Sequence, residues 1–293
     1  MINMNAGVLV GLALITAAPF GGAQRPSGAV QLEAADCSRY QSSFGTDEVA
    51  YTVQQASVPL GARLDVDPGQ NGGVRIEHGS GSTYSITACI AAGGETLAEA
   101  QRSAEAVRLQ IDGNRVRVSI GSEQRHASVH LIVEAPSGAQ VDAKTGNGPI
   151  SISDVDGSFT ARVTNGPIAL KNVSGAVRAA AANGPISISG SGGNVDVETQ
   201  NGPISVNLQG TQWTGELTGR AQNGPLTVKV AEGFTSGVEI SSSRRSPWNC
   251  RIAACRGEMS DNDQGTKTVS FGTGAVAVKL STVNGPVTLD SAR

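Results

Sequence analysis

The acidic side chains that lie close enough in the sequence to act together form two pairs. Asp154 and Asp156 lie in a predicted turn, and Asp196 and Glu198 point outward if the valines beside them are buried. Paired carboxylates are the catalytic groups of most glycoside hydrolases. Neither pair recurs on the neighbouring repeats described below, as a groove of acids would require, and only five Phe, three Tyr and two Trp are available to stack on sugars. The sequence therefore predicts no catalytic residues.

The three histidines give no metal site. His126 and His130 lie four residues apart in a stretch with strand-like alternation, so they share a face but are separated by roughly 13 Å along the chain. We interpret them as solvated strand residues. Residues 261–265, Asp-Asn-Asp-Gln-Gly, are similar to the start of a calcium loop but lack its distal Glu. We predict no metal and no cofactor.

The dominant pattern is a repeated Asn-Gly-Pro tripeptide. Its Asn residues are Asn147, Asn165, Asn183, Asn201, Asn223 and Asn284. The first three intervals are 18 residues long, the fourth is 22 and the last is 61. A short fixed period is typical of stacked structural repeats.

After each Pro, two apolar residues are separated by one other residue, as in Ile150-Ser151-Ile152. This alternation predicts a short strand with one buried face. About 18 residues are too few for a βαβ unit. We therefore predict an all-β fold, a parallel β-helix or β-solenoid, in which Ile150, Ile168, Ile186 and Ile204 form one buried column.

The tripeptide itself is typical of a tight corner. Asn tolerates a left-handed backbone, Gly adopts it freely, and Pro fixes φ where the next strand begins. We predict that the Asn side chains hydrogen-bond along the stack as a ladder. The alternative is a row of ligand-binding Asn residues. A second row, formed by the outward residues Ser151, Ala169, Ser187, Ser205 and Thr227, is a flat strip of small side chains that could dock an ordered surface.

If the chain is exported, as the features of residues 1–23 described below predict, its four cysteines indicate disulfides. We pair Cys37 with Cys89 and Cys250 with Cys255, although three connectivities are open. The spacing of Cys250 and Cys255 is not that of a zinc knuckle, and no His is near.

The 61-residue interval contains Arg244-Arg245-Ser246-Pro247-Trp248-Asn249-Cys250, which breaks the repeat pattern. Loops on a rigid scaffold often carry function. Arg244, Arg245 and Trp248 are therefore candidate partner-binding residues. The alternative is a surface excursion that is pinned by a disulfide and has no partner.

Residues 1–23 have the features of a secretory signal peptide. Ala6–Ala18 is a 13-residue apolar run, and Gly21 and Ala23 are small residues before a cleavage point at Gln24. The run lacks a preceding Lys or Arg, so a buried terminal strand is the alternative. No later apolar run reaches the ~20 residues of a membrane helix. We predict a secreted or periplasmic protein of the cell envelope.

The formal charge of −3 is spread without long runs, which gives no basic patch for nucleic acid.

One helix is predicted at about 96–108, because Thr96-Leu97-Ala98-Glu99 is a capping box. Its apolar stripe is Leu97, Ala100, Ala104 and Val107, and we expect it to cover an end or flank of the stack. Asp112-Gly113-Asn114 predicts a hairpin, so the N-terminal region is expected to be partly antiparallel.

These patterns predict four regions. A signal peptide (1–23) and a lead-in segment (24–54) precede an N-terminal β region with the helix (55–143). The repeats follow (144–293), with a loop insertion at 241–268. The last two regions are expected to form one continuous domain.

The spaced Asn-Gly-Pro-Ile units, Ala231-Glu232-Gly233-Phe234 and the segment Leu280–Val287 resemble the bacterial "putative adhesin" β-strand-repeat family, which is similar in appearance to bactofilin-like β-helices. The resemblance covers roughly residues 55–290. It implies an envelope protein with a signal peptide and a coil of parallel strands. It carries over no catalytic residues, and the 244–256 loop departs from the family pattern.

The predicted function is a non-catalytic scaffold or adhesin-like binding surface, with a protein or envelope surface as partner. The last repeat has almost nothing after it to cover its edge, which predicts self-association through the solenoid ends. Two alternatives remain: a polysaccharide-active lyase or hydrolase on a parallel β-helix, and an envelope-stress or signalling partner protein.

Overall fold

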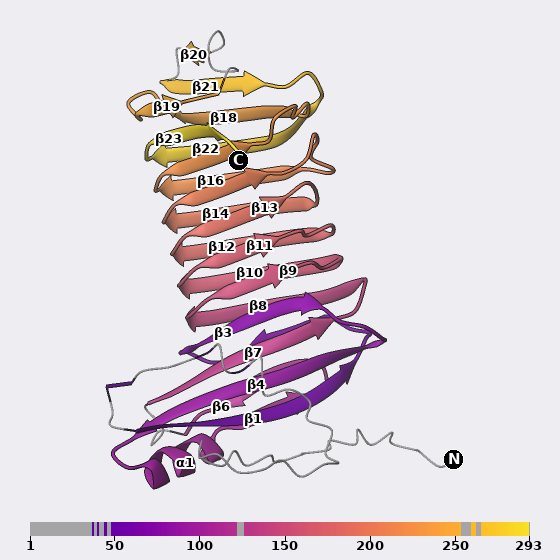
Figure 1. Ribbon diagram of the computed structural model, residues 1–293, viewed down its shortest axis with the longest axis vertical. Coiled ribbons are helices and arrows are strands. Elements are labelled where there is room, and N and C mark those ends of the chain that lie inside the picture. The colour runs from indigo at the N-terminus through magenta and orange to yellow at the C-terminus, as the bar shows by residue number, and fades with distance from the viewer. Residues whose placement is uncertain are drawn as a thin grey trace, which may run out of the picture.

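The computed structural model describes Cys37, Tyr40, Phe44, Gly45 and residues 48–121, 126–252, 259–261 and 265–292. In this part of the chain, two long β-sheets face each other along a narrow stack, with one helix at one end (Figure 1). The predicted signal peptide lies outside the described residues. No helix in the described ranges has the length and hydropathy needed to cross a membrane.

The first sheet, sheet A, has 11 strands in the described residues. In spatial order these are β1 (Glu48–Pro59), β4 (Thr83–Gly94), β7 (Ala127–Ala135), β3 (Gly72–His78), β9 (Ile150–Ser153), β11 (Ile168–Lys171), β13 (Ile186–Gly190), β15 (Ile204–Leu208), β17 (Leu226–Val230), β23 (Val287–Ser291) and β19 (Trp248–Cys250).

The second sheet, sheet B, has 12 strands in the described residues. From the opposite end of the stack they are β20 (Met259–Asp261), β21 (Thr266–Phe271), β18 (Gly237–Ser243), β22 (Val276–Asn284), β16 (Leu217–Asn223), β14 (Asn194–Asn201), β12 (Ala176–Asn183), β10 (Gly157–Asn165), β8 (Ala139–Asn147), β2 (Leu64–Asp67), β6 (Arg115–Ser119) and β5 (Arg108–Asp112).

The repeated unit is one layer of this stack. A strand of sheet B ends at an Asn, the Gly-Pro pair turns the corner, and a strand of sheet A follows. Successive layers pair in parallel with an offset of one repeat, so that Asn147 aligns with Asn165 in sheet B and Ile150 with Ile168 in sheet A. The period in the sequence therefore equals one traverse of both sheets.

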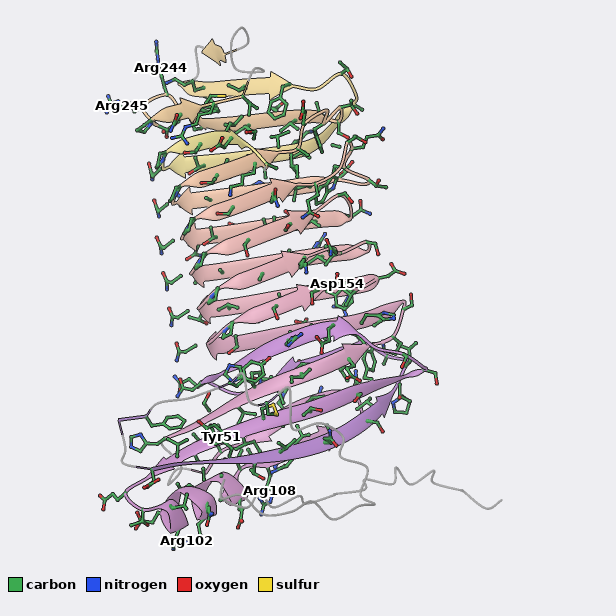
Figure 2. The ribbon with its side chains drawn as sticks, in the orientation of Figure 1. Tyr51, Arg102, Arg108, Asp154, Arg244 and Arg245 are labelled. Atoms are coloured by element: carbon green, nitrogen blue, oxygen red, sulfur yellow. A yellow bond between two sulfur atoms is a disulfide. The ribbon has the colours of Figure 1, made fainter. Side chains whose placement is uncertain are left out.

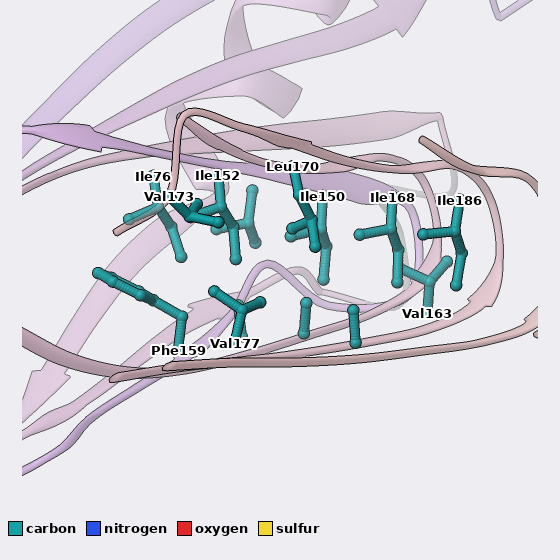
Figure 3. Packing of buried hydrophobic residues seen from close by; sticks show 14 of the residues in the cluster. Ile76, Ile150, Ile152, Phe159, Val163, Ile168, Leu170, Val173, Val177 and Ile186 are labelled. Atoms are coloured by element: carbon teal, nitrogen blue, oxygen red, sulfur yellow. The ribbon is translucent and has the colours of Figure 1, made fainter. Parts of the chain in front are cut away.

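The core lies between the two sheets. Ile150, Ile168, Ile186 and Ile204 are in register on adjacent strands and are fully buried, as predicted. Figure 3 shows three of these isoleucines in one row, with Val163 of sheet B across the interior from Ile168 and Ile186. The core forms a single hydrophobic cluster that extends from Ala50 to Leu289.

Both sheets are mixed, because antiparallel strands flank the parallel central layers. In sheet A, β4 pairs antiparallel with β1 and β7; in sheet B, β5 pairs with β6, and β21 with β18 and β20. The predicted hairpin is confirmed, and Gly113 adopts φ 58° in its turn.

The predicted helix is α1 (Leu97–Ala106), and Thr96 caps it by accepting a hydrogen bond from the Glu99 backbone N–H (3.3 Å). It contacts β4 and β1 at the end of the stack (Figure 1). Ala100 and Ala104 are buried, but Leu97 is 41% exposed, so its place in the apolar stripe is wrong. The helix packs through its alanines, and its backbone at Ala100 comes so close to Gly94 that a Cβ atom on Gly94 would lie 2.6 Å from Ala100 N.

The order of layers in space differs from their order in the sequence. The β22–β23 layer lies between β16–β17 and β18–β19, and β2–β3 lies between β6–β7 and β8–β9. The expected bare edge on the last repeat is therefore wrong, since β18 and β19 cover it. Self-association through the ends stays a prediction, and it would have to use other strands.

The predicted region boundaries do not coincide with strand boundaries. β1 begins at Glu48, inside the predicted lead-in segment; β8 crosses the 143/144 boundary; and the predicted insertion at 241–268 begins inside β18. How the chain divides into domains stays a prediction.

Candidate functional site

The Asn side chains of the corners form a hydrogen-bonded ladder along one side of the stack. Each Nδ2 donates to the Oδ1 of the Asn in the layer before it, at 2.8–3.1 Å. The first acceptor is Asn71, whose corner Asn71-Gly72-Gly73 lacks Pro and was missed in the sequence. The only sequence signal for it was an Asn-Gly pair before the alternating residues Val74 and Ile76. The ladder uses the amides that a row of ligand-binding Asn residues would need.

The Gly residues of the corners form a second column. A Cβ atom on any of the six would lie well under 3.0 Å from a backbone carbonyl oxygen of the preceding layer, closer than real Cβ atoms come. For Gly184 that atom is the oxygen of Gly166. These positions therefore require Gly chiefly because neighbouring backbones approach each other closely.

Substituting Asn183 with Asp is expected to destabilise the fold by about 1 kcal/mol. The carboxylate has no N–H for Asn165 Oδ1, so two acceptors would face each other in place of a 2.9 Å hydrogen bond. Urea unfolding at neutral pH measures the loss. The matched control is Gln200→Glu, which makes the same change of charge at an exposed position one layer away. Equal effects of the two variants would contradict a stabilising ladder.

Three of the four acidic candidates have structural partners on the surface. Asp154 has a left-handed backbone (φ 56°) in a corner, and its Oδ1 accepts from Asn172 Nδ2 at 2.7 Å. Asp156 accepts from Ser137 Oγ at 3.2 Å, and Asp196 pairs with Arg220 at 3.6 Å. Figure 2 shows Asp154 toward the lateral edge opposite Arg244 and Arg245. Among the described residues, no three His, Cys, Asp or Glu side chains are grouped to hold a metal ion.

The outer face of sheet B carries charges of both signs. Its ion pairs are Arg117–Asp65, Lys144–Asp67, Arg162–Asp142 and Arg220–Asp196. Arg117 donates two hydrogen bonds to the Asp65 carboxylate (3.2 and 2.8 Å), which lower the pKa of Asp65 and raise that of Arg117. Exposed pairs of this kind contribute about 0–1 kcal/mol each.

The outer face of sheet A carries the predicted strip of small residues. Ser151, Ala169, Ser187, Ser205 and Thr227 are aligned on adjacent strands, and Thr288 of β23 extends the row. In the next row, Lys171 and Lys229 are separated by Ser189 and Asn207. The strip is therefore flat and regular, with isolated cations at its margin.

The segment around Arg244 is not an excursion from the repeats, which corrects the sequence interpretation. β18 and β19 form one more layer, and the four residues Arg244–Pro247 take the place of an Asn-Gly-Pro corner. The corner has one residue more than the tripeptide, because Ser242 aligns with Thr282 while Trp248 aligns with Val287. A signal was present, since Pro247 follows Pro225 by 22 residues, the same interval that separates Asn201 from Asn223.

The three candidate binding residues lie at this outermost corner. Arg244 and Arg245 are exposed and project from the end of the stack (Figure 2). Trp248 is half-buried, and its Nε1 donates to Ser242 Oγ at 2.7 Å. Cys250 is disulfide-bonded, whereas Cys255 lies outside the described residues. The structure thus brings the two arginines and the tryptophan together on one corner.

The predicted Cys37–Cys89 disulfide is confirmed, and it joins Cys37 to β4 on the outer face of sheet A. Next to it, the ring of Tyr40 stacks on His130 of β7 at 4.3 Å. His130 is therefore not a solvated strand residue, and burial lowers its pKa. Phe44 meets His126 edge-on at 6.5 Å.

Acidification is expected to weaken the contact between Tyr40 and His130. Burial makes the pKa of His130 lower in the folded protein than in the unfolded chain. The contribution of neutral His130 to the free energy of unfolding is therefore complete above the ordinary pKa of His, and it declines as the pH falls below that value. Hydrogen exchange of β7 amides, compared between neutral and mildly acidic pH, measures the change. A His130→Gln variant should lose this pH dependence, and an unchanged dependence would contradict the assignment.

No protein-family model and no curated protein matches the sequence. Among solved structures, the chain is similar to a "putative adhesin" from Bacteroides fragilis (TM-score 0.37, 9% identity, 84% of this chain and 98% of the other). It is also similar to a "putative cell adhesion protein" from Clostridium sporogenes (TM-score 0.30, 10% identity, 84% and 100%) and a "putative lipid binding protein" from Parabacteroides distasonis (TM-score 0.27, 8% identity, 82% and 97%). At these TM-scores the likeness assigns no function to this chain.

Proposed function

We propose that this chain is an exported β-solenoid that acts as a non-catalytic scaffold or adhesin-like binding surface of the cell envelope. The observation that carries the proposal is the outer face of sheet A, where the strip from Ser151 to Thr288 runs across six adjacent strands. Side chains in such a row repeat every ~4.8 Å. A rigid, flat row of this kind can engage an ordered surface along its whole length.

Two features support export. The Cys37–Cys89 disulfide is typical of proteins in oxidising compartments, and residues 1–23 carry the pattern of a secretory signal. The solenoid itself is supported by the parallel layers, each offset from the next by one repeat.

The placement of the acids supports a binding role over catalysis. Retaining and inverting glycosidases place two carboxyl groups about 5–9.5 Å apart across one bond of the substrate. Here Asp154, Asp156 and Asp196 each bond to a different structural neighbour. Their carboxylates hold corners and strands of the stack.

A binding assay with envelope fractions tests the proposal. The purified chain from Gln24 onward is expected to bind envelope material, and Ser187→Arg with Ser205→Arg on sheet A should reduce binding. The matched control is Thr160→Arg with Thr218→Arg on the outer face of sheet B, on strands β10 and β16. Equal loss in both double variants, or none in either, would contradict the assignment to sheet A. Release of sugar fragments from envelope polysaccharides would instead support the enzyme alternative.

A further inference from the structure

The Asn284-Gly285 pair differs from the other five Asn-Gly-Pro corners in its hydrogen bonds. In those five, the Gly backbone N–H donates to the carbonyl oxygen of the Asn in the next layer, as Gly224 does to Asn284 at 2.9 Å. The Asn Oδ1 of each also accepts from the next Asn along the ladder. Within the described residues, neither the Gly285 N–H nor the Asn284 Oδ1 has such a partner.

The cause lies in the layer that covers this corner. The four residues Arg244–Pro247 form a corner that is one residue longer than the tripeptide, and the Ser246 N–H donates within it to Ser243 O at 3.0 Å. The corner also lacks a Gly, and a Cβ atom in the Gly column would press on the carbonyl of the layer before it. The chain rejoins the regular pattern only where Val287 N–H donates to Pro247 O (2.9 Å). Among the described residues, the Gly285 N–H therefore has no hydrogen bond of the kind that the other five corner glycines donate to the next layer.

We propose that Asn284 is a site of spontaneous deamidation, a covalent modification that requires only water. The deprotonated backbone nitrogen of Gly285 attacks Cγ of Asn284, forming a C–N bond, and the bond from Cγ to Nδ2 breaks to release ammonia. Water then opens the resulting succinimide at either carbonyl, which leaves aspartate or isoaspartate. Gly favours this attack because it has no Cβ to hinder the approach of its nitrogen.

The other five corners are protected in two ways. The Gly nitrogen already donates its proton to the next layer, and the Asn side chain is held by hydrogen bonds on both sides. Asn284 is exposed and is held by a single side-chain bond, from its Nδ2 to Asn223 Oδ1 at 2.9 Å. The related Asn71–Gly72 pair has a buried Gly and is also expected to react slowly.

The modification changes the end of the stack that carries Arg244 and Arg245. Aspartate places a negative charge beneath this corner and removes the donor to Asn223. Isoaspartate also lengthens the backbone between β22 and β23, which loosens the layer formed by β18 and β19.

The six identical tripeptides provide their own controls. The folded full-length chain is incubated at mildly alkaline pH, and peptide mapping by mass spectrometry measures aspartate and isoaspartate at each Asn. Asn284 is expected to react at least about tenfold faster than the other five, a factor that the missing hydrogen bonds account for. In the chemically unfolded chain the six rates should converge, because each Asn is followed by the same Gly-Pro pair. Equal rates in the folded chain, or a faster internal site, would overturn the proposal.

A second variant tests the cause. Replacing Arg244–Pro247 with Asn-Gly-Pro extends the ladder by one layer. The rate at Asn284 should then fall toward that of the internal sites, and the new outermost Asn should become the reactive one. An unchanged rate at Asn284 in this variant, with unfolding midpoint preserved, would overturn the proposed protection by the next layer.

Discussion

Replacing Gly184 with Ala is expected to disrupt the stack at its middle layer, with a loss of more than about 4 kcal/mol in the free energy of unfolding. The added Cβ would lie well under 3.0 Å from the carbonyl oxygen of Gly166. The Cβ is attached directly to the backbone of Gly184, and the oxygen belongs to the backbone of Gly166. Both backbone segments are fixed by the sheet pairing on either side of the corner, so the clash cannot be relieved by moving a flexible side chain. Urea unfolding followed by circular dichroism measures the loss.

Gly190→Ala is the matched control for this substitution. Gly190 lies in the same layer, at the end of β13, and a Cβ there would meet Asn172 N at 3.5 Å, which is ordinary van der Waals contact. This variant is expected to stay within about 1 kcal/mol of the parent. If Gly184→Ala were as stable as Gly190→Ala, close approach of the layers would not explain the Gly column.

Ile186→Ala is expected to cost about 2–5 kcal/mol, the range for a large buried side chain that leaves a cavity. Ile186 is fully buried and lies between Ile168 and Ile204 in the column. Because these neighbours are held in register by their own strands, the cavity cannot easily collapse. Chemical denaturation provides the measurement.

Ser187→Ala, on the outward face of the same strand, is the control for Ile186→Ala. Ser187 is exposed, so its replacement should change stability by no more than about 0.5 kcal/mol. A loss at Ser187 equal to that at Ile186 would mean that the two faces of β13 were assigned the wrong way round. A similar cost at Ile168 and Ile204 would show that each layer depends chiefly on its neighbours.

The central layers could be predicted from the sequence because local and global signals coincide there. The alternation after each Pro fixes which face is buried, and the constant interval fixes the register, so the column from Ile150 to Ile204 follows directly. The helix cap at Thr96 and the hairpin at Asp112-Gly113-Asn114 are likewise local patterns. The helix cap and the hairpin each depend only on a few residues that are close together in the sequence.

The order of the layers could not be predicted, because it depends on pairing between distant segments. The β2–β3 layer turns at a corner, Asn71-Gly72-Gly73, that lacks Pro. The outermost layer turns at Arg244–Pro247, which shares only its Pro with the tripeptide. A period measured along the chain assumes that layers adjacent in sequence are adjacent in space, and among the described parallel layers this holds for residues 139–230.

The candidate binding surfaces were only partly evident. The strip from Ser151 to Thr227 followed from alternation, since outward residues of equivalent strands must align. The contact between Tyr40 and His130 had no signal, because it joins a segment before the first strand to one about 90 residues later. The predicted Cys37–Cys89 disulfide was the only indication in the sequence that this segment lies against sheet A.

The position of β22–β23 inside the stack has a consequence for the path of folding. β18 and β19 precede Val276 in the chain, yet these two strands find their parallel partners only in β22 and β23. Assembly cannot simply advance from the amino to the carboxyl end; it must wait at β16–β17 until a long loop closes. Until that loop closes, the folding chain exposes unpaired strand edges on both sides of the gap, and this is when it most needs protection from aggregation.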